Sequence, residues 1–582
     1  MTDPTHARVA YFSMEIALES SIPTYSGGLG ALAGDMLRSA ADLELPMVGV
    51  TLAYRGGYFE QKLDGQGQQG ESPSVWEPES VVEPAGAAVT VEIEGRPVKV
   101  RGWRYRITGM GSRFVPVYLL DTALPENDPE DRKLTDRLYG GDRRYRLCQE
   151  AILGIGGVRL LRALGYARLE NFHMNEGHSA LLTLALLEEQ VQEHPDNPLN
   201  LEAEVARLRQ KCVFTTHTPV PAGHDVFDRS LVTQVVGSDQ ADRLAELGLM
   251  SNGQLNMTEL ALYCSRYVNG VAMRHGEVSR SMFPRFSIRA ITNGVHVGTW
   301  TCPPFQDLYD RLVPEWRQDN RYLRYAMGIS LDEILMAHAE AKQRLFAAIQ
   351  QETGVALDEA KLTLGFARRA AVYKRADLLL SDPDRLEQLA RTAGPLQIIY
   401  AGKAHPADEE GKALIRRIFE SSARLRDGVH LLYIENYDMR WGQLLTSGVD
   451  LWLNTPLRPY EASGTSGMKA ALNGVPSLSV LDGWWIEGHG EGVTGWSIGD
   501  DDSREGSWAE AESLYNKLET VVVPQFYRNP LAYAGVMRGA IAFNGSFFNT
   551  QRMLRQYTQN AYTLSVLGED GTEESELRWK VG

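Results

Sequence analysis

The sequence has little of what marks secreted, membrane-spanning and metal-binding proteins. Its 582 residues include only four cysteines, which lie far apart and form no CxxC pair (Cys148, Cys212, Cys264 and Cys302). We therefore expect reduced thiols, without a disulfide framework or a metal site. No apolar run approaches the roughly 18 residues that a membrane helix needs, and MTDPTHARVAYF lacks the basic-then-apolar pattern of a signal peptide. A cytoplasmic protein without a membrane partner is expected.

Positive charge is scarce as well. The chain has 59 Lys and Arg against 75 Asp and Glu, a net charge of −16, so no nucleic-acid partner is expected. One basic cluster stands out against this background: RRAAVYKR, residues 368–375, holds four cations and no acid. It precedes a helical pattern, where cations are unfavourable unless an anion binds. The cluster therefore predicts an anion site, although a solvated basic face would have the same composition.

Short apolar runs alternate with longer helical patterns, which is typical of α/β folds with parallel sheets. The first half opens with a strand at 8–15 and a helix from Leu29, and 89–107 predicts a hairpin. The glycine-rich run 65–70 predicts a surface loop, and the last hundred residues predict mainly helices. The second half predicts buried strands at 361–367, 396–404, 429–436, 449–454 and 476–482.

This pattern predicts two Rossmann-like, doubly wound domains. We place them at 1–297 and 298–582, the second ending in C-terminal helices. Ligands of such sheets bind at the carboxyl ends of the strands, so we expect the two domains to face each other across a binding cleft.

Two glycine-rich loops are candidates for lining that cleft. SGGLG (26–30) opens a helix whose first N–H groups could bind an anion, although a turn without a ligand explains it equally well. In EASGTSGMK (461–469), small residues expose N–H groups and hydroxyls, enough to hold one phosphate. Lys469 follows, and a lysine held away from water can lose its proton and condense with an aldehyde. Pyridoxal phosphate needs such an arrangement, but a helix lysine is more often a solvated charge.

The run EASGTSGMKAALNG (461–474) closely resembles the cofactor segment of the α-glucan phosphorylases, the family of glycogen, starch and maltodextrin phosphorylases. Other blocks match in the same order and cover most of the chain outside roughly 55–115 and 305–360. They are YSGGLGALAGDML, HMNEGHSALL, FTTHTPVPAGHD, VNGVAMRHGEVS, ITNGV, RRAAVYKR, YAGKAHP and IENY. The resemblance implies the two-domain GT-B glycosyltransferase fold and pyridoxal 5'-phosphate on Lys469.

The resemblance also implies roles for single residues. At the cofactor, it implies Thr465, Ser466, Arg368 and Gly28 on the phosphate side and Tyr437 and Trp300 along the ring. For substrate phosphate it implies Arg369 and Lys374 with the Gly28 N–H, and for the developing positive charge the carbonyl of His217. For the sugar it implies Glu461, Ser463, Gly464, Asn293, Tyr373 and Leu29, with Glu176 and His178 on the acceptor side.

The chain departs from the family pattern in three respects. Arg368 stands where the family usually has lysine, and the two side chains differ in geometry. The segment LYGGD (138–142) shows no counterpart of the family's sugar-contacting asparagine. Only 25 residues precede Ser26, so control by phosphorylation or AMP is not expected.

The activity implied is retaining phosphorolysis of α-1,4-glucan by inorganic phosphate, giving glucose 1-phosphate, in a homodimer. The phosphate of the cofactor would relay a proton, and no hydrolase-style carboxylate pair is identified. Three alternatives remain. A nucleotide-sugar glucan synthase shares the architecture but has no need of Lys469. A non-catalytic glucan-binding protein could keep the scaffold. An amino-acid-converting pyridoxal enzyme would need an acid or arginine at the pyridine nitrogen, and nothing in these blocks points to one.

Overall fold

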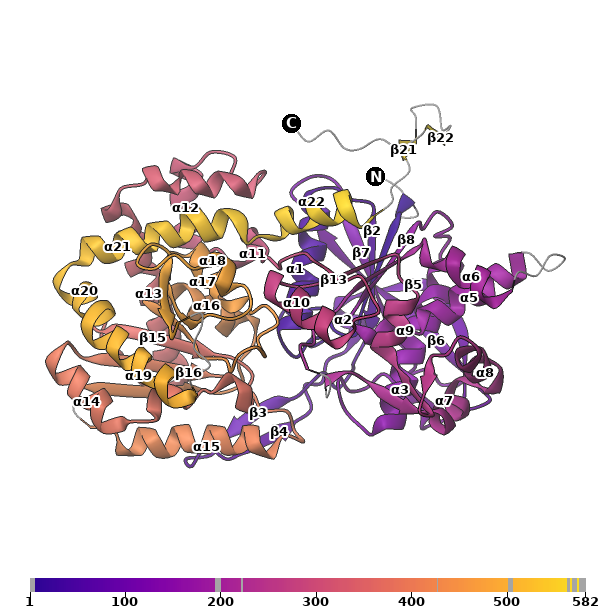
Figure 1. Ribbon diagram of the computed structural model, residues 1–582, viewed down its shortest axis with the longest axis horizontal. Helices are drawn as coiled ribbons and strands as arrows, with labels where there is room; N and C mark the ends of the chain where they lie inside the picture. Colours follow the sequence, from indigo (N-terminus) through magenta and orange to yellow (C-terminus); the bar gives the residue numbers. More distant parts are fainter. Residues whose placement is uncertain are drawn as a thin grey trace. The chain divides into compact units, whose positions relative to one another are not determined.

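The computed structural model describes residues 6–193, 200–220, 223–426, 428–500, 506–562, 566–567 and 573–574. The chain divides into two compact units, each built on its own sheet (Figure 1). Unit 1 comprises Met1–Tyr58, Pro73–Ile291 and Met553–Gly582, and unit 2 comprises Phe59–Ser72 and Thr292–Arg552. The predicted α/β class is thereby confirmed.

The sheet of unit 1 has nine strands in the order β14-β13-β9-β8-β1-β2-β7-β6-β5. Strands from β14 to β7 are parallel, and β6 and β5 extend the sheet as an antiparallel hairpin, as 89–107 predicts. All five residues of β1 are buried, because a central parallel strand is covered on both faces. The bounds are β14 Arg289–Ala290, β13 Tyr267–Gly270, β9 Cys212–Thr215, β8 Asn171–Asn175, β1 Val9–Ser13, β2 Met47–Leu52, β7 Phe114–Asp121, β6 Arg96–Thr108 and β5 Glu83–Ile93.

The sheet of unit 2 is parallel throughout, in the order β17-β16-β15-β18-β19-β20. Numbered along the chain this is 3-2-1-4-5-6, the doubly wound order with its switch point between β15 and β18. All five predicted strands form, and β20 is additional. The bounds are β17 Val429–Ile434, β16 Leu396–Ala401, β15 Leu362–Ala367, β18 Leu451–Asn454, β19 Ser477–Val480 and β20 Gly495–Ile498.

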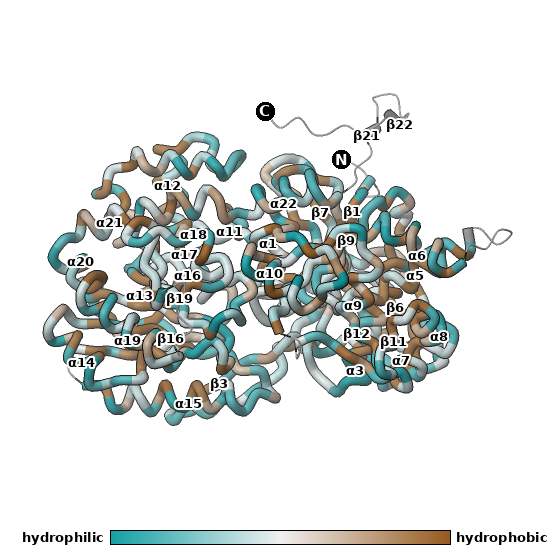
Figure 2. The backbone as a smooth tube through the Cα atoms, viewed as in Figure 1, coloured by the Kyte–Doolittle hydropathy of each residue, from teal (hydrophilic) through white to brown (hydrophobic). Residues whose placement is uncertain are grey.

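Several helices that pack against these sheets are amphipathic. Hydrophobic and hydrophilic residues alternate along α15 (Glu409–Arg424), and Leu414, Ile415 and Ile418 form its buried side (Figure 2). The C-terminal part is mainly helical, as predicted, with α19 (Ser507–Lys517), α20 (Val523–Arg528), α21 (Pro530–Gly539) and α22 (Thr550–Asn560). Across the described ranges, none of the helices combines the length and apolarity that crossing a bilayer requires.

Several features differ from the sequence expectations. The division near residue 291 lies close to the expected boundary, but residues 59–72 fall in unit 2 and 553–582 in unit 1. The run 65–70 is not wholly a surface loop, since Gln69 and Gly70 begin β4 (Gln69–Ser72), which pairs with β3 (Glu60–Leu63).

The basic cluster also differs from its expected setting, because the next α-helix, α14, begins only at Pro383. Residues 372–374 form a single 3-10 turn, so the helix-dipole argument for this cluster was wrong.

Candidate active site

The two segments singled out in unit 2 follow the two strands at its switch point. The basic cluster begins directly after β15 ends at Ala367, and the loop to Glu461 begins after β18 ends at Asn454. These strands are neighbours, with Leu364 opposite Leu451. Side chains at the carboxyl ends of two such strands converge on the crevice where doubly wound sheets bind ligands.

One buried carboxylate joins the cations of this crevice. Glu461 Oε2 lies 2.7 Å from Nη1 of Arg368 and 2.6 Å from Nζ of Lys374, and all three side chains are less than 10% exposed. Arg368 also donates to Asn454 at the end of β18. Burial by itself would raise the pKa of Glu461, but the charges of Arg368 and Lys374 lower it to about 2. Glu461 is therefore ionised at neutral pH, and two predicted phosphate-side cations converge on it.

A second carboxylate, Asp482, holds the backbone of this loop. Its Oδ2 accepts the Glu461 N–H at 2.9 Å and its Oδ1 accepts the Gly483 N–H at 2.9 Å. Burial, assisted by the charge of Glu461, raises the pKa of Asp482 to about 6. Asp482 was not among the predicted residues, because a single acid after a strand has no distinctive spacing.

Tyr373 lies beside the same cations. Lys374 Nζ is 4.6 Å from its ring centroid, and Arg369 Nη2 is 3.4 Å from its hydroxyl. Burial would raise the pKa of Tyr373, but Lys374 and Arg369 together lower it. Arg369 is the exposed member of the cluster. Its guanidinium is therefore open to solvent, whereas the side chains of Arg368 and Lys374 are only 8% and 9% exposed.

Lys469 is a buried side chain on a short helix. It lies on α17 (Ser466–Leu472), whose residues from Gly467 onward are buried, and is itself 8% exposed. Its Nζ lies 3.6 Å from the ring centroid of Trp300, at the end of α11 (Val297–Trp300). A Cβ on Gly442 would lie 3.1 Å from the Tyr437 hydroxyl and 3.4 Å from the Trp300 ring, so both aromatic side chains lie against Gly442. The Trp300 ring therefore lies close to both Lys469 and Tyr437.

The loop before Lys469 retains unused hydrogen-bonding groups. Ser463 Oγ is buried without a partner among the described atoms, and Thr465 caps α17 without a side-chain hydrogen bond. Ser466 Oγ accepts from Trp452 Nε1 at 3.0 Å, which leaves its own proton to donate. With the first N–H groups of α17, these hydroxyls form a donor set suited to a phosphate. The residues present therefore fit a phosphate-bearing aldehyde such as pyridoxal phosphate.

Two further residues of unit 2 that are predicted to bind the sugar, Gly464 and Asn293, differ in how they relate to Glu461. Gly464 has a φ of +79°, and a Cβ there would lie 3.3 Å from the carboxyl carbon of Glu461. Asn293 is buried, and its carbonyl accepts from Arg552 at 2.8 Å. Within the described ranges, no hydrogen bond joins Asn293 to the group around Glu461.

In unit 1, the glycine-rich loop is held by a buried acid. Glu15 Oε2 accepts the N–H groups of Ser26 at 2.5 Å and Gly27 at 3.1 Å, directly before α1 (Gly28–Asp42) begins. Its Oε1 accepts the Tyr139 hydroxyl at 3.0 Å. Gly28, predicted to bind phosphate, and Leu29, predicted to bind the sugar, directly follow the two residues whose N–H groups bond to Glu15. Tyr139, from the segment LYGGD, therefore bonds to the same acid that holds the glycine-rich loop.

The other predicted residues of unit 1 follow β8 and β9. Glu176 has a φ of +74°, and its Oε2 accepts the His217 N–H at 2.7 Å and the Thr218 hydroxyl at 3.0 Å. Burial lowers the pKa of His217 to about 3, so this imidazole is neutral. His178 lies 3.4 Å from Asp225 Oδ2, and burial, assisted by Arg146, lowers its pKa to about 3.

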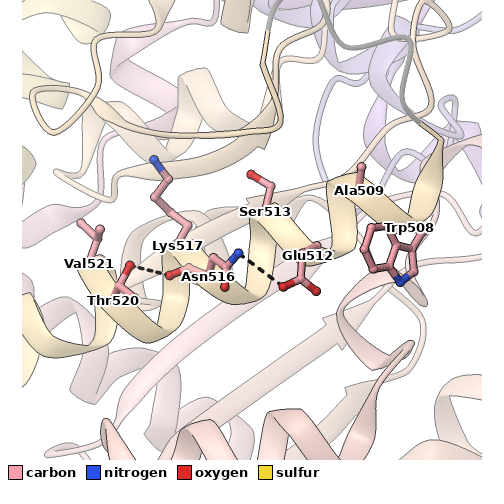
Figure 3. A pocket seen from close by; sticks show the side chains of 8 residues that line it. All are labelled: Trp508, Ala509, Glu512, Ser513, Asn516, Lys517, Thr520 and Val521. Atoms are coloured by element: carbon pink, nitrogen blue, oxygen red, sulfur yellow. Dashed lines mark hydrogen bonds between the residues drawn. The ribbon is translucent and has the colours of Figure 1, made fainter.

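A groove of about 410 Å³ along α19 contains none of the predicted site residues. Figure 3 shows the side chains that line it, including Trp508, Glu512 and Asn516. Arg385 pairs with Glu512 at 2.6 Å and donates to Asn516 at 2.6 Å, so these polar groups are already engaged. The groove is not the candidate active site.

Comparison with known proteins leads to the same region of the chain. The model of the carbohydrate phosphorylase family matches residues 16–108 and 224–493, which include SGGLG, the basic cluster and Lys469. The chain is 37% identical to the maltodextrin phosphorylase of Thermococcus litoralis, over 96% of this chain and 71% of that protein. It is 38% identical to the glycogen phosphorylase of Mycobacterium tuberculosis, over 95% and 70% of the two chains.

The match to a third relative spans a larger share of that relative's length. The glycogen phosphorylase of Aquifex aeolicus is 34% identical, over 97% of this chain and 87% of that protein. The family identified from EASGTSGMKAALNG is confirmed, and the chain belongs to the carbohydrate phosphorylases.

Proposed function

We propose that this chain is an α-1,4-glucan phosphorylase. It removes terminal α-1,4-linked glucosyl units with inorganic phosphate and releases glucose 1-phosphate with retained configuration. The observation that carries the proposal is the buried Lys469 against Trp300, on the helix that follows the Glu461 loop. Membership of the phosphorylase family supports it, as do relatives named maltodextrin and glycogen phosphorylase.

The residues around Lys469 would hold pyridoxal 5'-phosphate. Lys469 would be the attachment point, Trp300 and Tyr437 would lie along the ring, and Thr465, Ser466, Arg368 and Gly28 would be the donors for the phosphate. When bound, the cofactor supplies a phosphate whose second pKa of roughly 6 suits proton exchange near neutrality.

Arg369 and Lys374, with the Gly28 N–H, hold the substrate phosphate. Positive charge at these positions offsets the repulsion between that phosphate and neighbouring anions. The substrate phosphate gives its proton to the glycosidic oxygen as the bond from that oxygen to the anomeric carbon breaks. A phosphate oxygen then bonds to the anomeric carbon on the same face, which retains the configuration.

We assign several further residues to the binding of the sugar. The carboxylate of Glu461, ionised at neutral pH, accepts glucosyl hydroxyls, together with Ser463, Gly464, Tyr373, Asn293 and Leu29. The neutral His217 contributes its backbone carbonyl to the developing positive charge, and Glu176 and His178 contact the acceptor side. We further propose a cytoplasmic homodimer whose partners are an α-1,4-glucan and phosphate.

The proposal is tested with purified protein, a maltodextrin series and inorganic phosphate. Phosphate-dependent release of glucose 1-phosphate is expected, with no glucosyl transfer from ADP-glucose or UDP-glucose. Transfer from a nucleotide sugar without any phosphorolysis would identify a glucan synthase. Binding of maltodextrin without release of glucose 1-phosphate would identify a non-catalytic glucan-binding protein.

A further inference from the structure

The β3–β4 hairpin has no role in the proposed function, yet two buried glutamines fix it to loops of the candidate site. Figure 1 shows β3 and β4, coloured as N-terminal segments, beside the orange helix α15, and Arg416 of α15 donates to Gln68 at 3.0 Å. Gln61 and Gln69 lie on the inner face of this hairpin and are 1% and 4% exposed. Uncharged amides are buried at this level only where they have hydrogen-bond partners.

Gln61 bonds to the segments that follow β16 and β17. Its backbone N–H donates to Asn436 Oδ1 at 3.1 Å, and the Asn436 N–H donates to Gln61 Oε1 at 2.9 Å. Its side-chain Nε2 donates to the Gly402 carbonyl at 3.0 Å and to Gln69 Oε1 at 2.9 Å. One side chain therefore links both segments to the hairpin.

Gln69 pairs with the backbone of Ala404 as a strand residue would. Its Nε2 donates to the Ala404 carbonyl at 2.9 Å, and its Oε1 accepts the Ala404 N–H at 3.0 Å. The hydrogen-bonding atoms of both glutamine amides thus have partners. Removing such an amide leaves buried backbone groups unsatisfied, which costs more than the bond itself contributes.

The same segments hold residues of the site on their other side. The Arg368 N–H donates to the Ala401 carbonyl at 3.1 Å, and the Ala370 N–H donates to the Lys403 carbonyl at 2.9 Å. At Gly402 a Cβ would lie 1.9 Å from the Arg368 carbonyl oxygen, so these two stretches of backbone are in direct contact. Asn436, with a φ of +52°, immediately precedes Tyr437.

We propose that Gln61 and Gln69 are positioning residues for this active site. By fixing Gly402, Ala404 and Asn436, they hold the backbone of Arg368–Ala370 on the phosphate side and Tyr437 on the ring side. This rests on the proposed function, because it assigns phosphate and cofactor to those two sides. Neither glutamine touches a reacting group.

The test replaces each glutamine by methionine, which keeps the length of the side chain and removes its hydrogen bonds. Gln66→Met, at the exposed tip of the same hairpin, is the matched control. We expect Gln61→Met and Gln69→Met to raise KM for phosphate about 3- to 10-fold, while kcat changes less. Bound pyridoxal phosphate should leave both variants faster, and amide exchange at Ala404 and Asn436 should accelerate.

If the two glutamines only stabilise the fold, Gln61→Met and Gln69→Met will lower the melting temperature, while KM for phosphate and the rate of cofactor release stay as in Gln66→Met. That result would overturn the proposal. If the methionine variants do not fold, Gln69→Glu, which keeps the acceptor for the Ala404 N–H, is compared with Gln66→Glu by the same measurements. Failure of the proposed function is distinguishable, because the wild-type protein would then release no glucose 1-phosphate, whereas cofactor release and amide exchange would still report on the hairpin.

Discussion

At the scale of single residues, the centre in unit 2 is an ion cluster with one anion between two buried cations. Glu461 pairs with both Arg368 and Lys374. Without this carboxylate the two cations would be buried without an anionic partner, which lowers the stability of the fold. A bound phosphate would offer those cations a second anion. The carboxylate that we assign to sugar hydroxyls therefore also stabilises the phosphate-side cations before a substrate arrives.

Glu461→Gln should unfold at a lower temperature than the wild type, because two buried cations lose their partner at a cost of about 3 kcal/mol. Added inorganic phosphate should raise the melting temperature of the variant more than that of the wild type, since phosphate can replace the carboxylate. Glu512→Gln, which removes the more exposed pair with Arg385, should lose at most about 1 kcal/mol. Equal responses to phosphate in the variant and the wild type would contradict this account.

Asp482 should make stability depend on pH between about 4 and 6. Its pKa rises from an ordinary 3.8 to about 6 on folding, so the folded state binds a proton in this window while the unfolded state does not. As the pH falls from 7 to 5, the unfolding free energy of the wild type should increase relative to Asp482→Asn, by about 1–2 kcal/mol. Denaturant titrations at several pH values measure this difference.

Asp384→Asn, at an exposed position of α14, serves as the control. The pH dependence of Asp482→Asn is compared with that of this surface variant. A flat difference between Asp482→Asn and the wild type would contradict a raised pKa of Asp482 in the folded protein.

The sequence identified some of these residues and missed others for a physical reason. Lys469, Arg368 and Lys374 belong to compact runs whose composition is unusual by itself. Asp482 and Glu15 are single acids in ordinary surroundings, and their roles depend on backbone N–H groups that the fold brings to them. The pairing of Arg368 and Lys374 with Glu461 joins positions 93 and 87 residues apart, which no local pattern reveals.

At the scale of elements, the close packing of α17 sets the position of Lys469. A Cβ at Gly467 would lie 2.8 Å from the Trp484 ring and 3.0 Å from Ser477 Oγ. Residue 467 is two positions before Lys469, so a shift of the helix there moves the lysine relative to Trp300. Glycine is required at this position by the approach of its neighbours, since the helix itself would accept alanine.

Gly467→Ala should therefore bind pyridoxal phosphate more weakly, with faster release measured by the loss of cofactor absorbance after dilution. Gly535→Ala, on α21 with no atom within 4 Å of the added Cβ, is the matched control. That control should keep its cofactor and gain up to about 1 kcal/mol of stability, because alanine favours a helix. Equal cofactor release in the two variants would show that α17 tolerates the added methyl group.

Strands were the elements that the sequence predicted best. Each central strand of unit 2 is a buried apolar run between turn residues, and periodicity reports such runs well. The β3–β4 hairpin was missed in part because its turn is polar and glycine-rich, and because Gln61 and Gln69 bond to residues more than 330 positions away. The sequence pattern placed the start of the helix before α14 begins. Two 3-10 turns, at 372–374 and 378–380, precede α14, and their apolar residues have a spacing close to that of an α-helix.

At the scale of the whole molecule, the chain passes between the two units four times. The divisions fall at 58/59, 72/73, 291/292 and 552/553. The sequence pattern alone can reveal the division at 291/292, because one α/β pattern ends there and another begins. It could not find the others, because the assignment of 59–72 and 553–582 depends on long-range contacts.

The returning C-terminal segment is fixed in unit 1 by a buried polar network. The Tyr557 hydroxyl lies 2.9 Å from Thr215 Oγ1 and accepts from Asn269 Nδ2 at 3.0 Å. His173 bonds to Tyr562 at 2.8 Å, and burial lowers its pKa to about 3. The network therefore joins α22 and Tyr562, two residues beyond its end, to β8, β9 and β13 through uncharged groups.

Tyr557→Phe should weaken this attachment by about 1–2 kcal/mol, because buried donors on β9 and β13 lose a partner. Hydrogen exchange of the amides in β9 and α22 should accelerate by up to about 30-fold, with unit 2 unchanged. Tyr325→Phe, at an exposed position, should change exchange in neither unit. Unchanged protection of α22 in Tyr557→Phe would mean that apolar packing alone fixes the segment.

The central claim is that Lys469 carries an aldehyde cofactor next to the cations of the Glu461 cluster. Borohydride reduction of the purified, active protein, followed by peptide mass spectrometry, tests this most directly. We expect a reduced pyridoxal phosphate adduct on Lys469, and loss of both the adduct and glucose 1-phosphate release in Lys469→Ala. An active preparation without an adduct at Lys469, or with the adduct on another lysine, would contradict the account.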